Sequence, residues 1–91
     1  VRDDPARVAA NRERLRQHMA PCRPVFLQQV HGTTSLQLTA DTPDGIVADG
    51  CVALAGSGVA ATIMVADCLP VLLALRSGEA VAAAHAGWRG L

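Results

Sequence analysis

The chain has 91 residues, about half of them hydrophobic, and its eight basic residues balance its eight acidic residues. Because no basic stripe is interleaved with aromatic residues, nucleic acid is not expected as a partner. No apolar run approaches the roughly 20 residues that cross a bilayer, so no membrane contact is expected either. The three cysteines lack the spacing of a disulfide framework, which favours a reducing, cytoplasmic location.

The first predicted element is an amphipathic helix that begins at Asp4-Pro5, with Asp4 as the N-cap, and ends before Pro21. Two faces at helical spacing are expected, one packing on a sheet and the other solvated. The packing face is Val8, Asn11, Leu15 and Met19, and the solvated face is Arg7, Arg12, Arg14 and Arg16.

The rest of the chain is predicted to form strands joined by short turns. A helix followed by many strands without regular βα alternation favours an α+β fold with a mixed sheet. Runs 59–65 and 71–75 are almost continuously apolar, so we expect both faces of these strands to be covered. The expected strands are 24–30, 35–39, 46–54, 59–65, 71–75 and 80–84, with turns at 41–45, 56–58 and 76–79.

Three separated side chains carry the candidate chemistry: His31, Cys68 and His85. His31 ends a strand, and Cys68 follows another at a point where Pro70 is expected to interrupt the ladder. His85 directly follows an alanine-rich strand, where an imidazole needs a binding partner. Close behind it, Arg89 offers a fork of donors suited to phosphate or carboxylate.

Two imidazoles and one thiolate form a ligand set that zinc accepts, leaving a fourth position for water. The separations of 37 and 17 residues match no zinc finger. Copper is the weaker candidate, because Met64 is the only methionine near Cys68. A metal-free alternative has Cys68 as nucleophile and His85 as base, oriented by Asp67 or Asp49. The residues alone leave these alternatives open.

The motifs 29–32 (QVHG), 66–72 (ADCLPVL) and 85–90 (HAGWRG) resemble the YfiH-like family, also called the laccase-domain or multicopper polyphenol oxidase family. The resemblance covers the whole chain. It implies an α+β fold with α/β/β/α layers and a zinc site of His31, Cys68 and His85. The family's usual length is well over twice this one, so residues 1–91 are expected to be part of a larger single domain.

The activity that the resemblance implies is zinc-dependent phosphorolysis of adenosine, inosine or methylthioadenosine, with adenosine deaminase as a side activity. A purine nucleoside and phosphate would be the small-molecule partners. Cys68 and His85 would form the catalytic centre, Asp67 or Asp49 would transfer protons, and Arg89 would bind phosphate. The sequence does not indicate an oligomeric state.

Three alternatives accompany this prediction. Some members of the family are linked to peptidoglycan precursors, so a cysteine-dependent amidase is one. A copper-dependent polyphenol oxidase is another, disfavoured because three histidines cannot supply several coppers. The third is a metal-binding structural module without activity.

Overall fold

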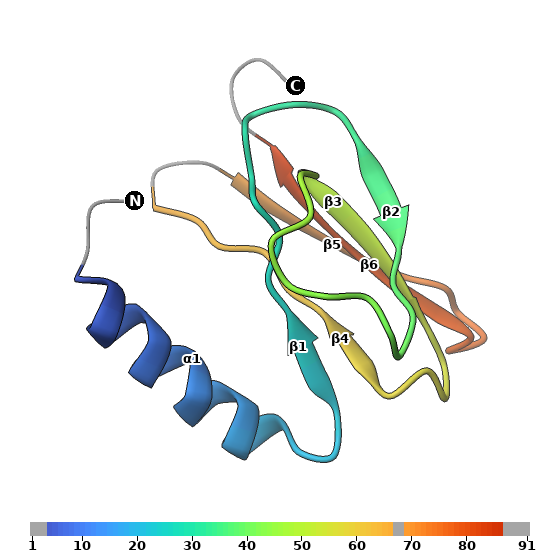
Figure 1. The fold of residues 1–91 in the computed structure, drawn as a ribbon. Helices are drawn as coiled ribbons and strands as arrows, with labels where there is room; N and C mark the ends of the chain where they lie inside the picture. The colour runs from blue at the N-terminus through green and yellow to red at the C-terminus, as the bar shows by residue number, and fades with distance from the viewer. Residues whose placement is uncertain (1–3, 67–68, 87–91) are drawn as a thin grey trace.

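The computed structural model describes residues 4–66 and 69–86, which form one helix and six strands. The helix packs on a two-stranded sheet, which in turn lies against a four-stranded sheet (Figure 1). Three of the four expected layers are therefore present in this part of the chain. The elements are α1 (Pro5–Met19), β1 (Arg23–Val25), β2 (Ser35–Gln37), β3 (Gly50–Leu54), β4 (Val59–Ala61), β5 (Leu69–Ala74) and β6 (Ala80–Ala86).

Helix α1 has the predicted bounds. The Asp4 side chain accepts a hydrogen bond from the backbone N–H of Ala6 at 3.0 Å, and Pro5 occupies the first turn. Proline fits there because the first N–H groups of a helix have no partner within it. No helix among the described residues has the length and hydrophobicity to cross a bilayer.

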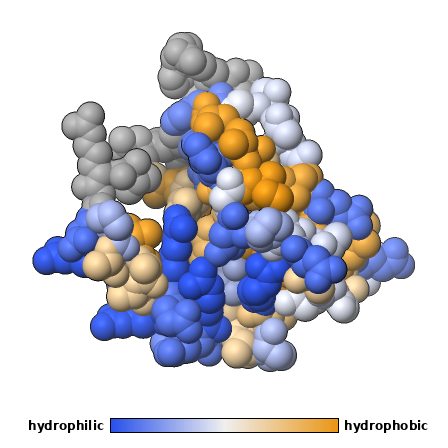
Figure 2. Space-filling view, in the orientation of Figure 1, coloured by the Kyte–Doolittle hydropathy of each residue, from blue (hydrophilic) through white to orange (hydrophobic). Residues whose placement is uncertain are grey.

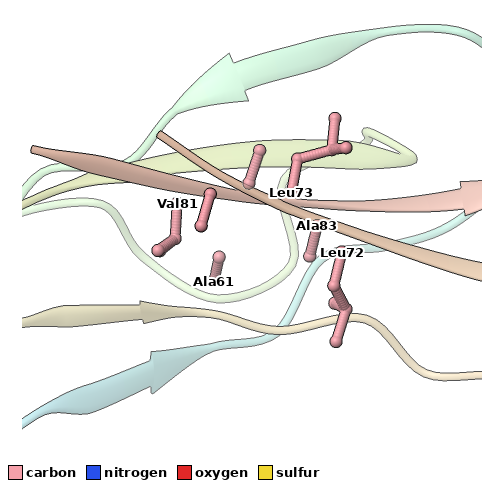
Figure 3. A pocket seen from close by; sticks show the side chains of 7 residues that line it. Ala61, Leu72, Leu73, Val81 and Ala83 are labelled. Atoms are coloured by element: carbon pink, nitrogen blue, oxygen red, sulfur yellow. The ribbon is translucent and has the colours of Figure 1, made fainter. Parts of the chain in front are cut away.

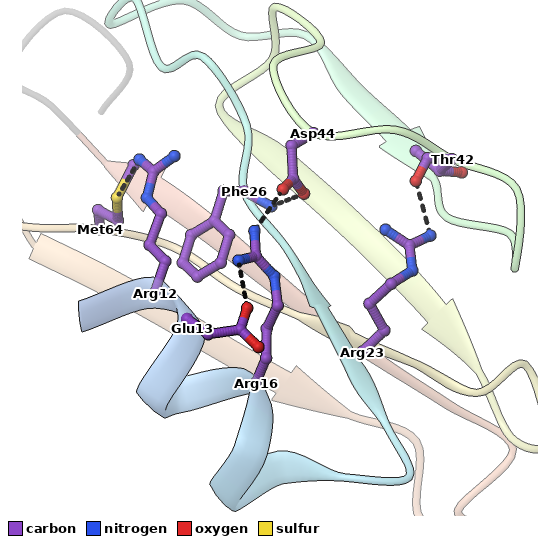
Figure 4. A network of polar contacts seen from close by, with 8 residues as sticks. All are labelled: Arg12, Glu13, Arg16, Arg23, Phe26, Thr42, Asp44 and Met64. Carbon is purple, nitrogen blue, oxygen red and sulfur yellow. Dashed lines mark hydrogen bonds and ion pairs between the residues drawn. The ribbon is translucent and has the colours of Figure 1, made fainter. Parts of the chain in front are cut away.

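The predicted faces of α1 are only partly correct: Val8 is half-buried and Arg7 and Arg14 are exposed, as expected, but other positions differ. Leu15 is 39% exposed, whereas Arg12 and Arg16 are half-buried against the body of the protein. Their guanidinium carbons lie 4.5 and 5.6 Å from the centre of the Phe26 ring (Figure 4). Cation–π attraction and the apolar stems of arginine let these residues act as packing groups. Arg16 also forms an ion pair with Asp44 at 2.9 Å.

The strands confirm a mixed topology. In the small sheet, β1 pairs with β4 in parallel. In the larger sheet the order is β2-β3-β6-β5, with β2 parallel to β3 and the other pairs antiparallel. The predicted link at 76–79 joins β5 to β6, and Gly78 takes a φ of 79° there.

The core lies between the two sheets and consists mainly of small and aliphatic side chains. Its members come from segments scattered along the chain, so the two sheets are held together by contacts between residues distant in sequence. The buried cluster is Val25, Leu27, Leu38, Ala48, Cys51, Ala53, Val59 and Ala83.

The prediction that both faces of the 71–75 strand are covered is wrong. Leu72 is 74% and Leu73 is 64% exposed, and successive strand residues point to opposite faces. A band of hydrophobic residues is correspondingly visible over the four-stranded sheet (Figure 2). Pro70 lies within β5 instead of interrupting it, which is possible because β5 is an edge strand in the described part of the sheet.

We predict that Leu38→Ala lowers the free energy of unfolding by about 3 kcal/mol, because Leu38 is 1% exposed in the inter-sheet core. The matched control is Leu15→Ala on α1, where the side chain is already 39% exposed and we expect a loss below about 1 kcal/mol. Urea denaturation of the full-length protein measures both. Equal losses for the two variants would contradict this description of the core.

Candidate functional site

Three segments distant in sequence bring His31, Asp49 and His85 together. His31 lies in the segment after β1, Asp49 immediately precedes β3, and His85 lies near the end of β6. The sequence predicted a strand that stops at Ala84, but β6 continues to Ala86, so His85 is a strand residue. The extended strand directs its imidazole to the inter-sheet side, where His85 is 8% exposed.

The carboxylate of Asp49 is the centre of this arrangement. Oδ1 accepts the backbone N–H groups of Val30 and Gly32, and Oδ2 accepts that of His31, each at 3.0 Å. Oδ2 also bonds to Nδ1 of His85 at 2.8 Å. One carboxylate that is only 3% exposed therefore fixes both histidine-bearing segments.

Asp49 is ionised despite its burial. Desolvation alone would raise the pKa of the carboxyl group, but the bonds from His85, Val30, Gly32 and His31 outweigh it and lower the pKa from 3.8 to about 2. Hydrogen bonds that favour the charged form have this effect. An ionised carboxylate only accepts hydrogen bonds, so Nδ1 of His85 carries the proton.

The backbone at His31 adopts a left-handed conformation with a φ of 60°. This conformation is uncommon for residues other than glycine and costs roughly 1 kcal/mol or more. It turns three consecutive N–H groups toward one anion, an arrangement known as a nest. Asp49 provides that anion, so the buried carboxylate compensates for the backbone strain.

The two imidazole rings lie next to each other. Their centroids are 4.8 Å apart and the planes meet at 65°, an edge-to-face contact. With Nδ1 of His85 bound to Asp49, the lone pair of the neutral ring is on Nε2. A carboxylate bound to the far nitrogen of a histidine is the usual support for a metal-ligating imidazole, so these residues fit the predicted metal.

The third predicted ligand, Cys68, lies outside the described residues, as do Asp67 and Arg89. Within the described ranges no three metal-binding side chains come together; His31 and His85 supply two, and Asp49 is occupied by hydrogen bonds. Strand β5 begins at Leu69 and pairs with the end of β6, so that Leu69 lies opposite Ala86. The chain therefore returns beside His85 immediately after Cys68.

A cavity of about 350 Å³ adjoins this cluster, which is within the range of small-molecule sites. Its hydroxyl-bearing side chains, Thr33, Thr34 and Ser35, were not predicted as site residues. Their position directly after the His31-Gly32 motif is the sequence feature that could have indicated them as site residues. The remaining lining residues are Gly32, Asp49, Gly50, Val71, Ala84, His85 and Ala86.

A second cavity, of about 330 Å³, lies between Ala61 and strands β5 and β6 (Figure 3). Its lining consists of alanine, leucine and valine side chains, so it offers no chemistry. Cys51 is a packing residue of the buried core, and burial raises the pKa of its thiol although hydrogen bonds from the backbone oppose the shift.

Comparison with known proteins identifies the family. The family described as "Multi-copper polyphenol oxidoreductase laccase" matches residues 1–91. The chain belongs to this family. A structural comparison agrees: the crystal structure of the Neisseria meningitidis protein NMB0706 has a TM-score of 0.82 and 44% sequence identity over 99% of the chain and 36% of that protein. The resemblance noted in the three motifs is thereby confirmed.

Relatives in this laccase-like family carry the name purine nucleoside phosphorylase. One from Pseudomonas aeruginosa is 54% identical over the whole chain and 36% of its own length. Another, YfiH of Escherichia coli, is 47% identical over 98% of the chain and 37% of its own length. The chain thus spans little more than a third of the relatives it matches.

We predict that Asp49 makes stability depend on acid pH. The unfolded carboxyl group binds a proton below about pH 3.8 and the folded one only near pH 2, so this contribution is complete above pH 4 and is lost as the pH falls to 2. The lowered pKa corresponds to about 2 kcal/mol. Urea unfolding of the full-length protein between pH 5 and 2 measures it against Asp49→Asn, which lacks this titration. Parallel pH profiles for the two proteins would contradict the prediction.

Proposed function

We propose that this site is the metal centre of a zinc-dependent purine nucleoside phosphorylase, with His31, Cys68 and His85 as the ligands. The observation that carries the proposal is the imidazole pair fixed by one buried carboxylate. Asp49 keeps the proton of His85 on Nδ1 and sets the ring orientation, which leaves Nε2 for the metal. The names of the relatives supply the reaction class.

Bound zinc would supply Lewis acidity, polarising a substrate oxygen or activating a water molecule. Arg89 binds the attacking phosphate, since its planar guanidinium matches two phosphate oxygens. In phosphorolysis a phosphate oxygen attacks the sugar carbon, the bond from sugar to base breaks, and the leaving base takes up a proton. Asp67 is the proposed donor of that proton.

Asp49 has a positioning role in this proposal. All the bonds described above place its oxygens against N–H groups, and a pKa of about 2 makes it a poor proton carrier near neutral pH. The adjoining cavity accommodates the nucleoside, with the hydroxyls of Thr33, Thr34 and Ser35 available to its polar groups. For the proposed adenosine deaminase side activity, a water oxygen would instead attack C6 of the adenine ring, and the exocyclic amino group would leave as ammonia to give inosine.

We predict that His31→Ala abolishes stoichiometric zinc binding and lowers adenosine phosphorolysis by at least about 100-fold, because the site loses a ligand. His18→Ala is the matched control. His18 is the remaining histidine, exposed on α1 with Nδ1 bonded to the Arg14 carbonyl, and we expect full zinc and activity. Metal analysis and an adenosine-plus-phosphate assay on the full-length protein measure both quantities.

Three other results would contradict the zinc role or favour a different function. Full phosphorolysis by metal-free wild-type protein would exclude the zinc role. Stoichiometric copper with oxidation of phenols would favour the oxidase. Activity on peptidoglycan precursors that survives a chelator but is blocked by thiol alkylation would favour the cysteine-dependent amidase.

We predict that Arg89→Met raises the KM for phosphate by at least about tenfold, with little change in the KM for adenosine, because only the phosphate loses a charged partner. Arg76→Met, at an exposed position in the link between β5 and β6, is the control and should leave both constants unchanged. Steady-state kinetics with each substrate varied in turn provides the test. An equal rise in both KM values would contradict the phosphate role.

A further inference from the structure

The half-buried side chain of Gln29 joins two segments that are distant in sequence. Its Nε2 donates to the carbonyl of Met64 at 2.7 Å, and its Oε1 accepts from the N–H of the same residue at 2.9 Å. A single carboxamide thereby satisfies both backbone groups of Met64. The pair of bonds fixes distance and orientation together, as one hydrogen bond alone does not.

This contact lies where the parallel ladder of the small sheet stops. The last pair of that ladder is Val25 with Ala61, and from Gln28 the backbone bonds instead to the segment 46–48. Continuing the register would place Gln29 opposite Val65. The Gln29 side chain thus replaces the missing backbone pairing and keeps the two segments together beyond the end of the sheet.

Both joined segments lead directly to proposed site residues. Gln29 lies two residues before His31, in the segment whose next three N–H groups are bound by Asp49. Met64 lies four residues before Cys68. The sulfur of Met64 also accepts a contact from Arg12 Nη2 at 3.4 Å, so α1 contacts this segment as well (Figure 4).

We propose that Gln29 is a positioning residue that sets the spacing between the His31 segment and the segment leading to Cys68. This inference rests on the proposed metal site and assigns a residue outside the ligand set to its assembly. Asp49 fixes His31 relative to His85, and Gln29 fixes the His31 segment relative to the polypeptide that carries the thiolate. Removing the carboxamide releases the second constraint while the first remains.

Gln29→Ala and Gln29→Glu test this role in the full-length protein. Alanine removes both bonds, and glutamate keeps the size but cannot donate to the Met64 carbonyl when ionised. We expect each variant to weaken zinc binding by about tenfold or more, as is typical when the supporting partners of metal ligands are removed. Competition with a chelating dye gives the zinc Kd.

Two controls separate positioning from general destabilisation. Gln28→Ala alters the exposed neighbouring side chain and should leave the zinc Kd unchanged. Arg23→Met removes hydrogen bonds to the carbonyls of Ala40 and Thr42, away from the site, and should lower Tm without changing the zinc Kd. A zinc Kd for Gln29→Ala equal to that of the wild type would overturn the inference.

A measurement on zinc-free protein keeps this test separate from that of the proposed function. Peptide mapping after brief alkylation gives the modification rate of each cysteine. We expect Gln29→Ala to change the rate at Cys68 by at least about threefold while the exposed Cys22 reacts as in the wild type. An unchanged rate at Cys68 would contradict the role of Gln29, whereas wild-type protein that binds no zinc would contradict only the metal centre.

Discussion

The carboxylate of Asp49 accepts hydrogen bonds from three consecutive backbone N–H groups and from the imidazole of His85, and the local structure of the site depends on these bonds. They stabilise the left-handed backbone at His31 and fix the proton of His85 on Nδ1. Together these hydrogen bonds also keep the buried carboxyl group ionised, with a pKa of about 2. One side chain thereby controls the backbone, the tautomer and the local charge.

The position of this carboxylate follows from the fold around it. Asp49 precedes β3, which pairs with β6 so that the backbone carbonyl of Asp49 accepts the N–H of His85 at 2.7 Å. Small residues on β3 and β6 allow the segments to approach closely. At Gly50 an added Cβ would lie only 3.1 Å from the Cβ of Ser35, so the absence of a side chain there permits β2 to pair beside the site.

Local sequence patterns predicted most of the elements but not how their faces are used. The bounds of α1 were predictable from Asp4-Pro5 and Pro21, because capping and proline act within a few residues. The burial of Arg12 and Arg16 was not, since it depends on Phe26 and Asp44 from elsewhere in the chain. The prediction that both faces of strand 71–75 are covered was wrong for the same reason, because an apolar run indicates a strand but not what packs on it.

The sequence by itself determined the helix, the order of the six strands and the mixed α+β class, because caps and turn residues are local signals, and it predicted His31 and His85 as site residues. Some strands are shorter than predicted, since the runs 24–30 and 59–65 correspond to β1 (Arg23–Val25) and β4 (Val59–Ala61). Only the tertiary structure decided what surrounds those histidines. It assigned Asp49 as the common acceptor, placed the two rings in contact, and used Gln29 to join the segments beyond the ladder. These bonds join residues 17 to 36 positions apart, and such partners are chosen by the packing of the sheets rather than by any pattern along the chain.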